Sequence, residues 1–186
     1  FYCIPNRVSR INADEERINE IKSIMPHDAI IFLRIGRLNT AYLQTVLQSY
    51  RLVVHLNTLN IRAFLVCIGV PESKGATSKI SEICTRNTLV LTEKKFTDDA
   101  SKLIEIADFV IGTGRGFMEA SSVGKVMLTP LAGMPHPVLV DESNFQELMS
   151  SNFSPRNTLE NFSNCENLRK ITAVCNSNVE RSMYGK

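Results

Sequence analysis

The chain has 186 residues, 44% of them hydrophobic, so it can bury one substantial core and we expect a single domain. The formal net charge of +2 comes from basic residues scattered along the chain, which argues against a nucleic-acid-binding surface. The five cysteines form no CxxC pair and no Cys/His cluster with metal-ligand spacing, which predicts reduced thiols and no metal site.

Helix and strand patterns alternate along most of the chain. The expected strands are short apolar runs at Ala29–Ile35, Ala63–Ile68, Leu89–Leu91, Phe109–Ile111 and Val126–Leu128. The expected helices cover about 12–25, 39–55 and 80–84, then a segment beginning at Thr97, a short helix that contains Glu119, and two pieces in a C-terminal helical tail, residues 152–186. Residues 1–12 are expected to form an interdomain linker, and Gly69–Thr77 to form a surface loop.

Three helix starts are predicted from capping signals. Asn12 precedes a segment rich in acidic residues, Thr97 precedes Asp98 and Asp99, and Asn164 precedes the last amphipathic segment. Each pattern favours an N-cap at the named residue, because these side chains can accept a hydrogen bond from the free amide groups of a first turn.

Strands that are apolar throughout and separated by helices indicate an α/β domain with a Rossmann-like parallel sheet covered by helices on both faces. In such folds ligands bind outside the carboxyl ends of the strands. Gly36, Gly69, Gly112 and Pro130 each follow an expected strand at that edge. This edge is therefore the predicted location of a site.

The stretch around which the site is predicted is a glycine-rich turn between the strand at 109–111 and a helix. Gly112, Gly114 and Gly116 can bring backbone N–H groups against an anion at the positive end of that helix. Glu119 suits either a ribose hydroxyl pair or simple stabilisation of the helix N-terminus. Because βα turns are commonly rich in glycine, the motif alone leaves phosphate binding and plain packing equally open.

Other charged or titratable side chains are candidates for the same edge. Arg115 is expected to grip phosphate oxygens with its guanidinium, the alternative being a solvated surface arginine. Arg34 lies within a strand pattern that sends it into a helix interface or a salt bridge, so it is left out of the predicted site. His27 and His55 fit structural or exposed positions better than catalytic ones, and both interpretations of His136 stay open.

Several of these residues together resemble a known family. Pro5-Asn6, then a strand followed by Gly36-Arg37-Leu38, a strand followed by Gly69, and a strand and loop followed by Glu119-Ala120 resemble the C-terminal half of family-four glycosyltransferases. The resemblance implies one half of a GT-B fold, in which Arg37 contacts the donor diphosphate, Glu119 holds the ribose, and Gly133 lies in a donor loop. The sequence departs from the family where a lysine usually follows the arginine, where a first glutamate usually precedes Glu119, and where His136 replaces a glutamate.

The resemblance predicts a hexosyltransferase-like, retaining glycosyltransferase of polysaccharide biosynthesis that binds a UDP-, GDP- or ADP-sugar as donor and needs no metal or other cofactor. The acceptor, a glycan or a lipid-linked sugar, would be bound by an N-terminal domain absent from this chain, so the isolated domain is expected to be inactive. The full-length protein is expected to be cytoplasmic, with peripheral membrane association as one open expectation and no nucleic-acid partner. Two alternatives remain: a GT-B sugar-nucleotide epimerase, and a non-catalytic nucleotide-binding or interaction domain.

The catalytic residues of the predicted site are Arg37 and Arg115. Its donor-binding residues are Gly36, Arg37, Gly112, Gly114, Arg115, Gly116, Glu119, Gly133 and His136.

Overall fold

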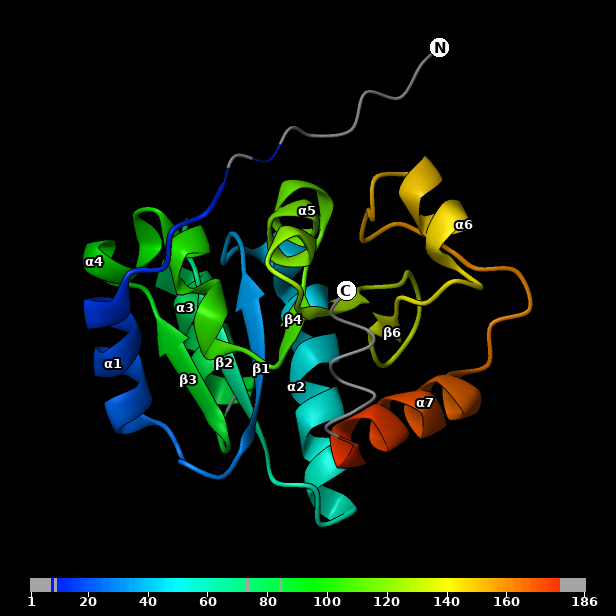
Figure 1. Cartoon of the computed structure of the whole chain (residues 1–186), viewed down its shortest axis with the longest axis horizontal. Helices are drawn as coiled ribbons and strands as arrows, with labels where there is room; N and C mark the ends of the chain where they lie inside the picture. Colours follow the sequence, from blue (N-terminus) through cyan, green and yellow to red (C-terminus); the bar gives the residue numbers. More distant parts are fainter. Residues whose placement is uncertain (1–7, 9, 73, 84, 178–186) are drawn as a thin grey trace.

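A computed structural model of the chain describes residues 8, 10–72, 74–83 and 85–177. A six-stranded sheet forms its centre (Figure 1). The strands are β1 (Ile30–Ile35), β2 (Ala63–Ile68), β3 (Thr88–Leu91), β4 (Phe109–Ile111), β5 (Val126–Thr129) and β6 (Val138–Leu139). The helical elements are α1 (Glu15–Ile24), η1 (Thr40–Tyr42), α2 (Leu43–Thr58), α3 (Lys74–Ile83), α4 (Lys94–Thr97), η2 (Ala100–Ile106), α5 (Gly114–Ser122), α6 (Phe145–Ser150) and α7 (Asn164–Asn176).

The strand order is β3-β2-β1-β4-β5-β6, and the first five strands are parallel. This confirms the predicted Rossmann-like α/β class. The sixth strand pairs with β5 in the antiparallel sense, with Leu128 opposite Leu139 and Thr129 opposite Val138, and the prediction of a purely parallel sheet did not include it. Carboxyl ends of the five parallel strands therefore meet at one edge, which is uppermost in Figure 1.

The strands form where the sequence is apolar at every position, because both faces of the sheet are covered. Alternate residues of β1 enter opposite cores. Ile31 and Leu33 belong to a core closed by α1, η2 and α5, whereas Phe32 belongs to a second core closed by α2 and α7. Cys67 of β2 is fully buried in the second core.

Two of the predicted helix caps are displaced by one or two residues. The N-cap of α1 is Asp14 rather than Asn12, and the Asp14 carboxylate accepts a hydrogen bond from the backbone N–H of Arg17. The N-cap of α7 is Ser163 rather than Asn164, with the Ser163 hydroxyl accepting from the N–H of Glu166. In both cases two neighbouring polar residues can cap, and packing of the apolar face selects one of them.

The prediction that a helix starts at Thr97 is wrong. Thr97 ends the short helix α4, which begins at Lys94 and buries Phe96 in the first core. The chain then turns through Asp99, whose φ of 52° is left-handed, into the 3-10 segment η2. Burial of a large aromatic residue has outweighed the local capping signal.

Other boundaries also differ. Helix α3 begins at Lys74, within the expected surface loop, and Cys84 lies outside the described residues. Of the two helices expected in the C-terminal tail, the described part contains one, α7; the other short helix, α6, precedes residue 152. The expected linker also lies largely outside the described part, because residues 1–7 and 9 are not described.

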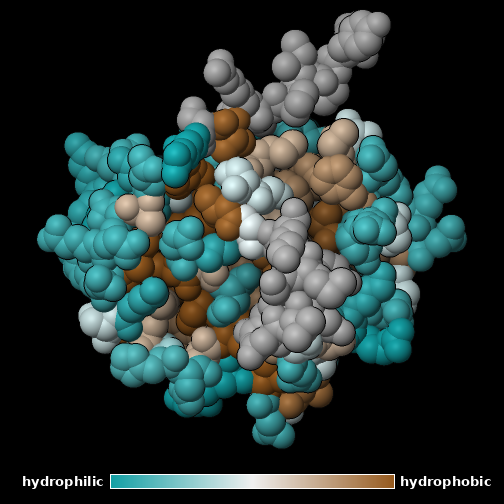
Figure 2. Space-filling model, in the orientation of Figure 1, coloured by the Kyte–Doolittle hydropathy of each residue, from teal (hydrophilic) through white to brown (hydrophobic). Residues whose placement is uncertain are grey.

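The face shown in Figure 2 carries both hydrophobic and hydrophilic residues. The hydrophobic ones gather in the middle of the view, and the hydrophilic ones dominate its left and right margins. Among the described residues, no helix combines the length and the apolar character needed to cross a membrane.

Candidate functional site

The carboxyl edge of the parallel strands brings together the turns that follow β1 and β4. These strands are neighbours, with Phe32 opposite Phe109 and Leu33 opposite Val110, so the turns at Gly36 and Gly112 leave the sheet side by side (Figure 1). The turn after β2 approaches equally closely: a Cβ added to Gly69 would lie 1.9 Å from the carbonyl oxygen of Gly36. Only glycine allows this approach of two backbones.

Arg37 projects from the first of these turns. Its side chain is 74% exposed, and its Nε lies 3.7 Å from Oε1 of Glu72. The other carboxylate oxygen of Glu72 accepts a hydrogen bond of 2.6 Å from Nδ2 of Asn39. The arginine is therefore available to a ligand at the sheet edge, with one exposed carboxylate as its competitor.

Arg115 and Glu119 lie one turn apart on α5 and pair with each other. Nε of Arg115 donates to Oε1 of Glu119 at 2.7 Å, with side-chain exposures of 76% and 15%. Pairs at this spacing on a helix contribute only about 0.2–0.5 kcal/mol, so a ligand that offers phosphate and ribose oxygens can compete for both groups.

The glycine amides of the β4–α5 turn already have acceptors. The N–H of Gly112 donates to Leu128 O in the sheet at 2.9 Å, and that of Gly116 donates to Thr113 O at 3.1 Å. The N–H of Gly114 donates to the carbonyl oxygen of Asn152 at 3.1 Å. Gly114 and Gly116 belong to the first turn of α5 rather than to a loop before it.

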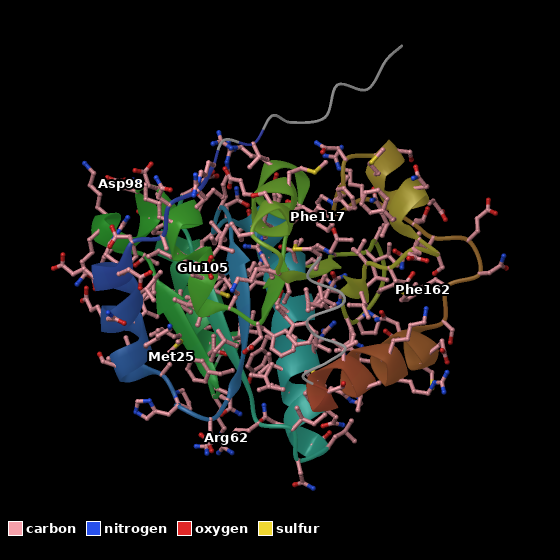
Figure 3. All side chains as sticks on the ribbon, viewed as in Figure 1. Met25, Arg62, Asp98, Glu105, Phe117 and Phe162 are labelled. Carbon is pink, nitrogen blue, oxygen red and sulfur yellow. The ribbon has the colours of Figure 1, made fainter. Side chains whose placement is uncertain are left out.

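Packing between β4 and α5 explains why position 112 is a glycine. A Cβ at this position would lie 2.9 Å from the backbone nitrogen of Phe117, so glycine lets α5 pack directly against the end of β4. The ring of Phe117 in turn stacks on Phe153, with 3.6 Å between ring centroids (Phe117 is labelled in Figure 3). The packing interpretation of this glycine is therefore shown by the structure, and phosphate binding through the turn stays a prediction.

The Gly133 loop is held in place by a buried amide. Nε2 of Gln48 on α2 donates to the carbonyl oxygens of Leu131 and Met134, both at 2.7 Å, and its Oε1 accepts from the N–H of Leu131. Gly133 itself is exposed, with a φ of 70° that favours glycine. A loop fixed on one side and exposed at its tip can present its backbone to a ligand.

His136 contacts a different part of the molecule. Its Nδ1 lies 3.2 Å from Oδ1 of Asn164 at the start of α7, and its ring centre lies 5.7 Å from that of His55 on α2. Burial, and to a smaller degree the nearby His55 and Arg51, lower the pKa of His136 despite the opposing bond to Asn164. These contacts link His136 to α2 and α7 rather than to the turns at Gly36 and Gly112.

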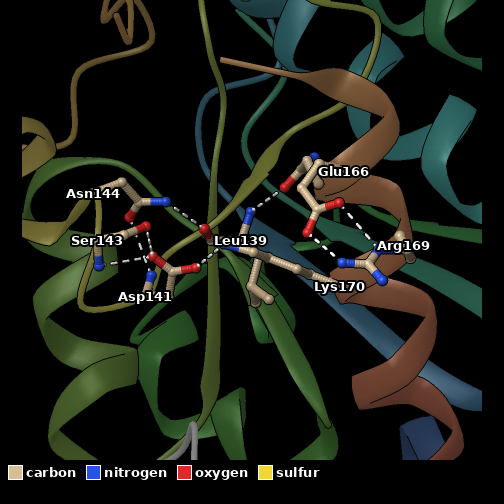
Figure 4. Close-up of polar contacts among 8 residues, drawn as sticks. Leu139, Asp141, Ser143, Asn144, Glu166, Arg169 and Lys170 are labelled. Atoms are coloured by element: carbon tan, nitrogen blue, oxygen red, sulfur yellow. Dashed lines mark hydrogen bonds and ion pairs between the residues drawn. The ribbon is translucent and has the colours of Figure 1, made fainter. Parts of the chain in front are cut away.

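A recess of about 200 Å³ lies on the other side of the domain, between β6, α6 and α7. Asp141 in this recess is paired: its Oδ2 accepts from Lys170 at 2.7 Å, and its Oδ1 accepts from the N–H of Ser143 at 2.9 Å (Figure 4). Burial alone would raise the pKa of Asp141. The hydrogen bonds from Lys170 and Ser143 lower that pKa by more, so the net shift is downward. None of the predicted site residues lines this recess.

Two features of the strand edge were missed by sequence reasoning. Glu72 and Asn152 both lie in segments far along the chain from the groups that they contact, and neither carries a motif. Arg34 was placed correctly in a helix interface, where it contacts Thr45, and no salt bridge forms there within the described part of the chain. Among the described residues, no group of three or more His, Cys, Asp or Glu side chains could hold a metal ion.

Solved structures with a similar fold include several glycosyltransferases. The chain has the fold of a glycosyltransferase domain. It superposes on a glycosyltransferase from Rickettsia africae with a TM-score of 0.58 and 15% identity, covering 94% of this chain and 46% of that one. It superposes on the C-terminal domain of a group 1 glycosyl transferase from Francisella tularensis with a TM-score of 0.55 and 14% identity. That match covers 95% of this chain and 90% of the Francisella domain.

A third structure of this fold is the UDP-GlcNAc 2-epimerase from Neisseria meningitidis, solved with UDP-GlcNAc bound, with a TM-score of 0.56 and 9% identity over 92% of this chain and 43% of that one. The chain thus spans less than half the length of the Rickettsia and Neisseria proteins. No family model matches the sequence, and no curated protein matches it. At these identities the likeness concerns the fold.

Proposed function

We propose that this chain is the donor-binding domain of a retaining glycosyltransferase, and that it binds the nucleoside diphosphate part of a nucleotide sugar. The observation that carries the proposal is the placement of two arginines after the neighbouring parallel strands β1 and β4, at the edge where ligands of such sheets bind. Arg37 follows β1, and Arg115, which pairs with Glu119, follows β4. The likeness to the C-terminal domain of the Francisella group 1 glycosyl transferase supports it, because that domain matches nearly end to end.

Each group has a role in this proposal. Arg37 and Arg115 contact the diphosphate, since a guanidinium can donate two parallel hydrogen bonds to phosphate oxygens. Glu119, released from Arg115, accepts hydrogen bonds from the ribose hydroxyls. Gly36 leaves the edge open for the phosphates, and the exposed backbone at Gly133 faces the sugar side of the donor.

The chemistry asked of this domain is electrostatic. As the bond between the sugar and the diphosphate breaks, negative charge grows on the departing phosphate, and fixed cationic groups at the sheet edge stabilise that charge. An acceptor hydroxyl, presented by a second domain, forms a bond to the sugar as the bond to the diphosphate breaks, and its proton passes to the oxygen of the departing diphosphate. Transfer needs both substrates held in one geometry, so we expect the purified 186-residue chain to bind donor nucleotide without transferring sugar.

Calorimetric titration of the chain with UDP, GDP and ADP tests the proposal. One of the three should bind with a dissociation constant below a millimolar level, and its uncharged nucleoside should bind more weakly, because the phosphates supply the charge-assisted contacts. Absence of binding by all three nucleotides would contradict the proposed function. Turnover of donor and acceptor by this chain alone would contradict the requirement for a second domain.

A non-catalytic interaction domain is the second candidate, and one observation favours it. The carbonyl of Asn152 occupies the N–H of Gly114, and both edge arginines already have carboxylate partners, Glu72 and Glu119. A domain that had lost donor binding would keep such internal pairs. The same titration distinguishes the two candidates, because only the first one predicts a nucleotide whose affinity depends on the arginines.

A further inference from the structure

Arg34 places a buried positive charge directly beneath the candidate site. It is the fifth residue of β1, and only 5% of its surface is exposed. Nε and Nη2 donate to the hydroxyl oxygen of Thr45 at 3.1 and 2.5 Å. The third nitrogen, Nη1, is buried and has no hydrogen-bond partner among the described residues.

This arrangement is energetically costly for a protein without ligand. A guanidinium taken out of water needs hydrogen bonds for all its N–H groups and an opposite charge, and a neutral hydroxyl supplies neither in full. Burial lowers the pKa of Arg34, and Cys67 and Tyr42 offset part of that shift, yet an arginine side chain stays protonated at neutral pH. Among the described residues, this buried cation therefore has no carboxylate partner.

The unpaired Nη1 lies next to Gly36. A Cβ built on Gly36 would lie 3.0 Å from Nη1 and 3.5 Å from Nη2, so the absence of a side chain there leaves the guanidinium against bare backbone. Gly36 is the first residue beyond β1, and it directly precedes Arg37. The buried charge thus lies under the point where the strand edge meets the proposed diphosphate.

Arg34 also differs from the two exposed arginines of this edge. Arg37 has Glu72 as a partner and Arg115 has Glu119, so an arriving diphosphate must compete with a carboxylate at each of them. An oxyanion at Arg34 displaces no carboxylate and supplies the missing acceptor. Among these three guanidinium groups, Arg34 has the most to gain from an anion.

Resting on the proposed function, we propose that Arg34 is a further binding residue of this site, whose Nη1–H donates to a phosphate oxygen of a diphosphate bound over Gly36. Because Nη1 is enclosed in the free structure, the bond forms with a local shift of Gly36 and of the turn that follows it, residues 37–42. Arg34 is then part of the reason why the site selects a diphosphate over an uncharged nucleoside.

The experiment compares Arg34→Met and Arg34→Gln with the wild-type chain. The control is Arg62→Met, which removes the same charge from a side chain that is 62% exposed and paired with Asp28 at the opposite edge of the sheet (Arg62 is labelled in Figure 3). The probes are UDP, GDP, ADP and inorganic pyrophosphate, titrated by calorimetry. Thermal unfolding of each variant is measured without ligand.

Both Arg34 variants should lose about tenfold or more in affinity for the bound nucleotide and for pyrophosphate, as expected for one charge-assisted hydrogen bond. Their melting temperatures should equal or exceed that of the wild type, because a buried, uncompensated charge has been removed. Arg62→Met should change affinity less than twofold. Nucleotide should alter amide hydrogen exchange in residues 36–42 of the wild type and leave it unaltered in Arg34→Gln.

The outcomes separate this inference from the proposed function. If the wild type binds none of the four probes, both are overturned. If the wild type binds and both Arg34 variants bind equally well, only the role of Arg34 is overturned. A fall in melting temperature in both variants also overturns it, because that result identifies Arg34 as a packing residue held by Thr45.

Discussion

Two regions of the domain differ in how completely their polar groups are hydrogen-bonded. They are the strand edge at Gly36 and Gly112, and the side formed by β6, α6 and α7. On the β6 side, the buried amide of Asn167 donates to Pro137 O and accepts from the N–H of Leu139, and Asp141 is paired with Lys170. At the strand edge, Nη1 of Arg34 is unpaired and the exposed arginines have easily exchanged partners. Fully satisfied polar groups stabilise a fold, whereas unsatisfied ones are characteristic of places where a ligand is expected.

This comparison predicts the largest loss of stability on the β6 side. Asn167→Ala removes the partner of Leu139 N–H and of Pro137 O, leaving two buried backbone groups unsatisfied. We expect the free energy of unfolding to fall by about 2–4 kcal/mol, with nucleotide affinity per folded molecule unchanged. Urea unfolding measures the first quantity and calorimetry the second.

Glu166→Gln is the matched control, because Glu166 lies one residue before Asn167, has 46% of its side chain exposed and pairs with Arg169 at the surface. Its effect on the free energy of unfolding should stay within about 0.5 kcal/mol. A loss at Asn167 no larger than that of the control would show that the β6 side is not fixed by its buried amide.

The opposite behaviour is expected of the edge arginines. Arg37→Ala and Arg115→Ala should each weaken nucleoside diphosphate binding by about 1.5–3 kcal/mol and weaken binding of the uncharged nucleoside much less. Stability should barely change, since both side chains are about three-quarters exposed. Calorimetry with the two ligands measures the contrast.

Arg62→Ala serves as the control for charge, since its guanidinium lies at the other edge of the sheet. Equal losses for nucleotide and nucleoside would point to altered base contacts instead of phosphate contacts. An unchanged affinity in Arg115→Ala would mean that Glu119 keeps this guanidinium away from the ligand.

Glu119 is more buried than Glu72, the other carboxylate that pairs with an arginine of this edge, with side-chain exposures of 15% and 44%. If it accepts from ribose hydroxyls, Glu119→Gln should weaken nucleotide and nucleoside alike by about 1–3 kcal/mol, because both carry the ribose. If it serves only to hold Arg115, the nucleoside should be unaffected. Calorimetry with both ligands decides, and thermal unfolding without ligand reports any structural role.

Sequence reasoning predicted the strands well and the helix starts less well. β2 was predicted to the residue, because a fully buried strand has an apolar residue at every position. The start at Thr97 was wrong because burial of Phe96 is a tertiary effect that the capping pattern does not contain. The antiparallel β6 depends on the path of a loop that Gln48 fixes from a distant helix.

The candidate site was predictable only in part, for a related reason. The turns at Gly36 and Gly112 were predicted at the sheet edge because each follows a parallel strand, and the structure confirms that they lie there after neighbouring strands. The partners of their residues were not predictable, because Asn152 reaches Gly114 and Glu72 reaches Arg37 through tertiary packing. The burial of Arg34 followed from the strand pattern, but its unpaired nitrogen depends on which side chains α2 presents to it.

The smallest predicted effect concerns pH and the Asp141–Lys170 pair. The pKa of Asp141 in the folded protein lies below its ordinary value of 3.8, so the folded state binds fewer protons than the unfolded state near that pH. The resulting stability is fully present above the unfolded pKa and is lost as the pH falls through the folded pKa.

Asp141→Asn should therefore be less stable than the wild type at pH 7, by about 1 kcal/mol, and the gap should close as the pH is lowered below about 4. The amide can still accept one hydrogen bond from Ser143 or Lys170, which keeps the loss small and the recess intact. Urea unfolding at pH 7, 5 and 3 measures the gap. A gap that stays constant with pH would show that the loss comes from packing rather than from the charge of Asp141, and nucleotide affinity should be unchanged at pH 7 because this pair lies away from the strand edge.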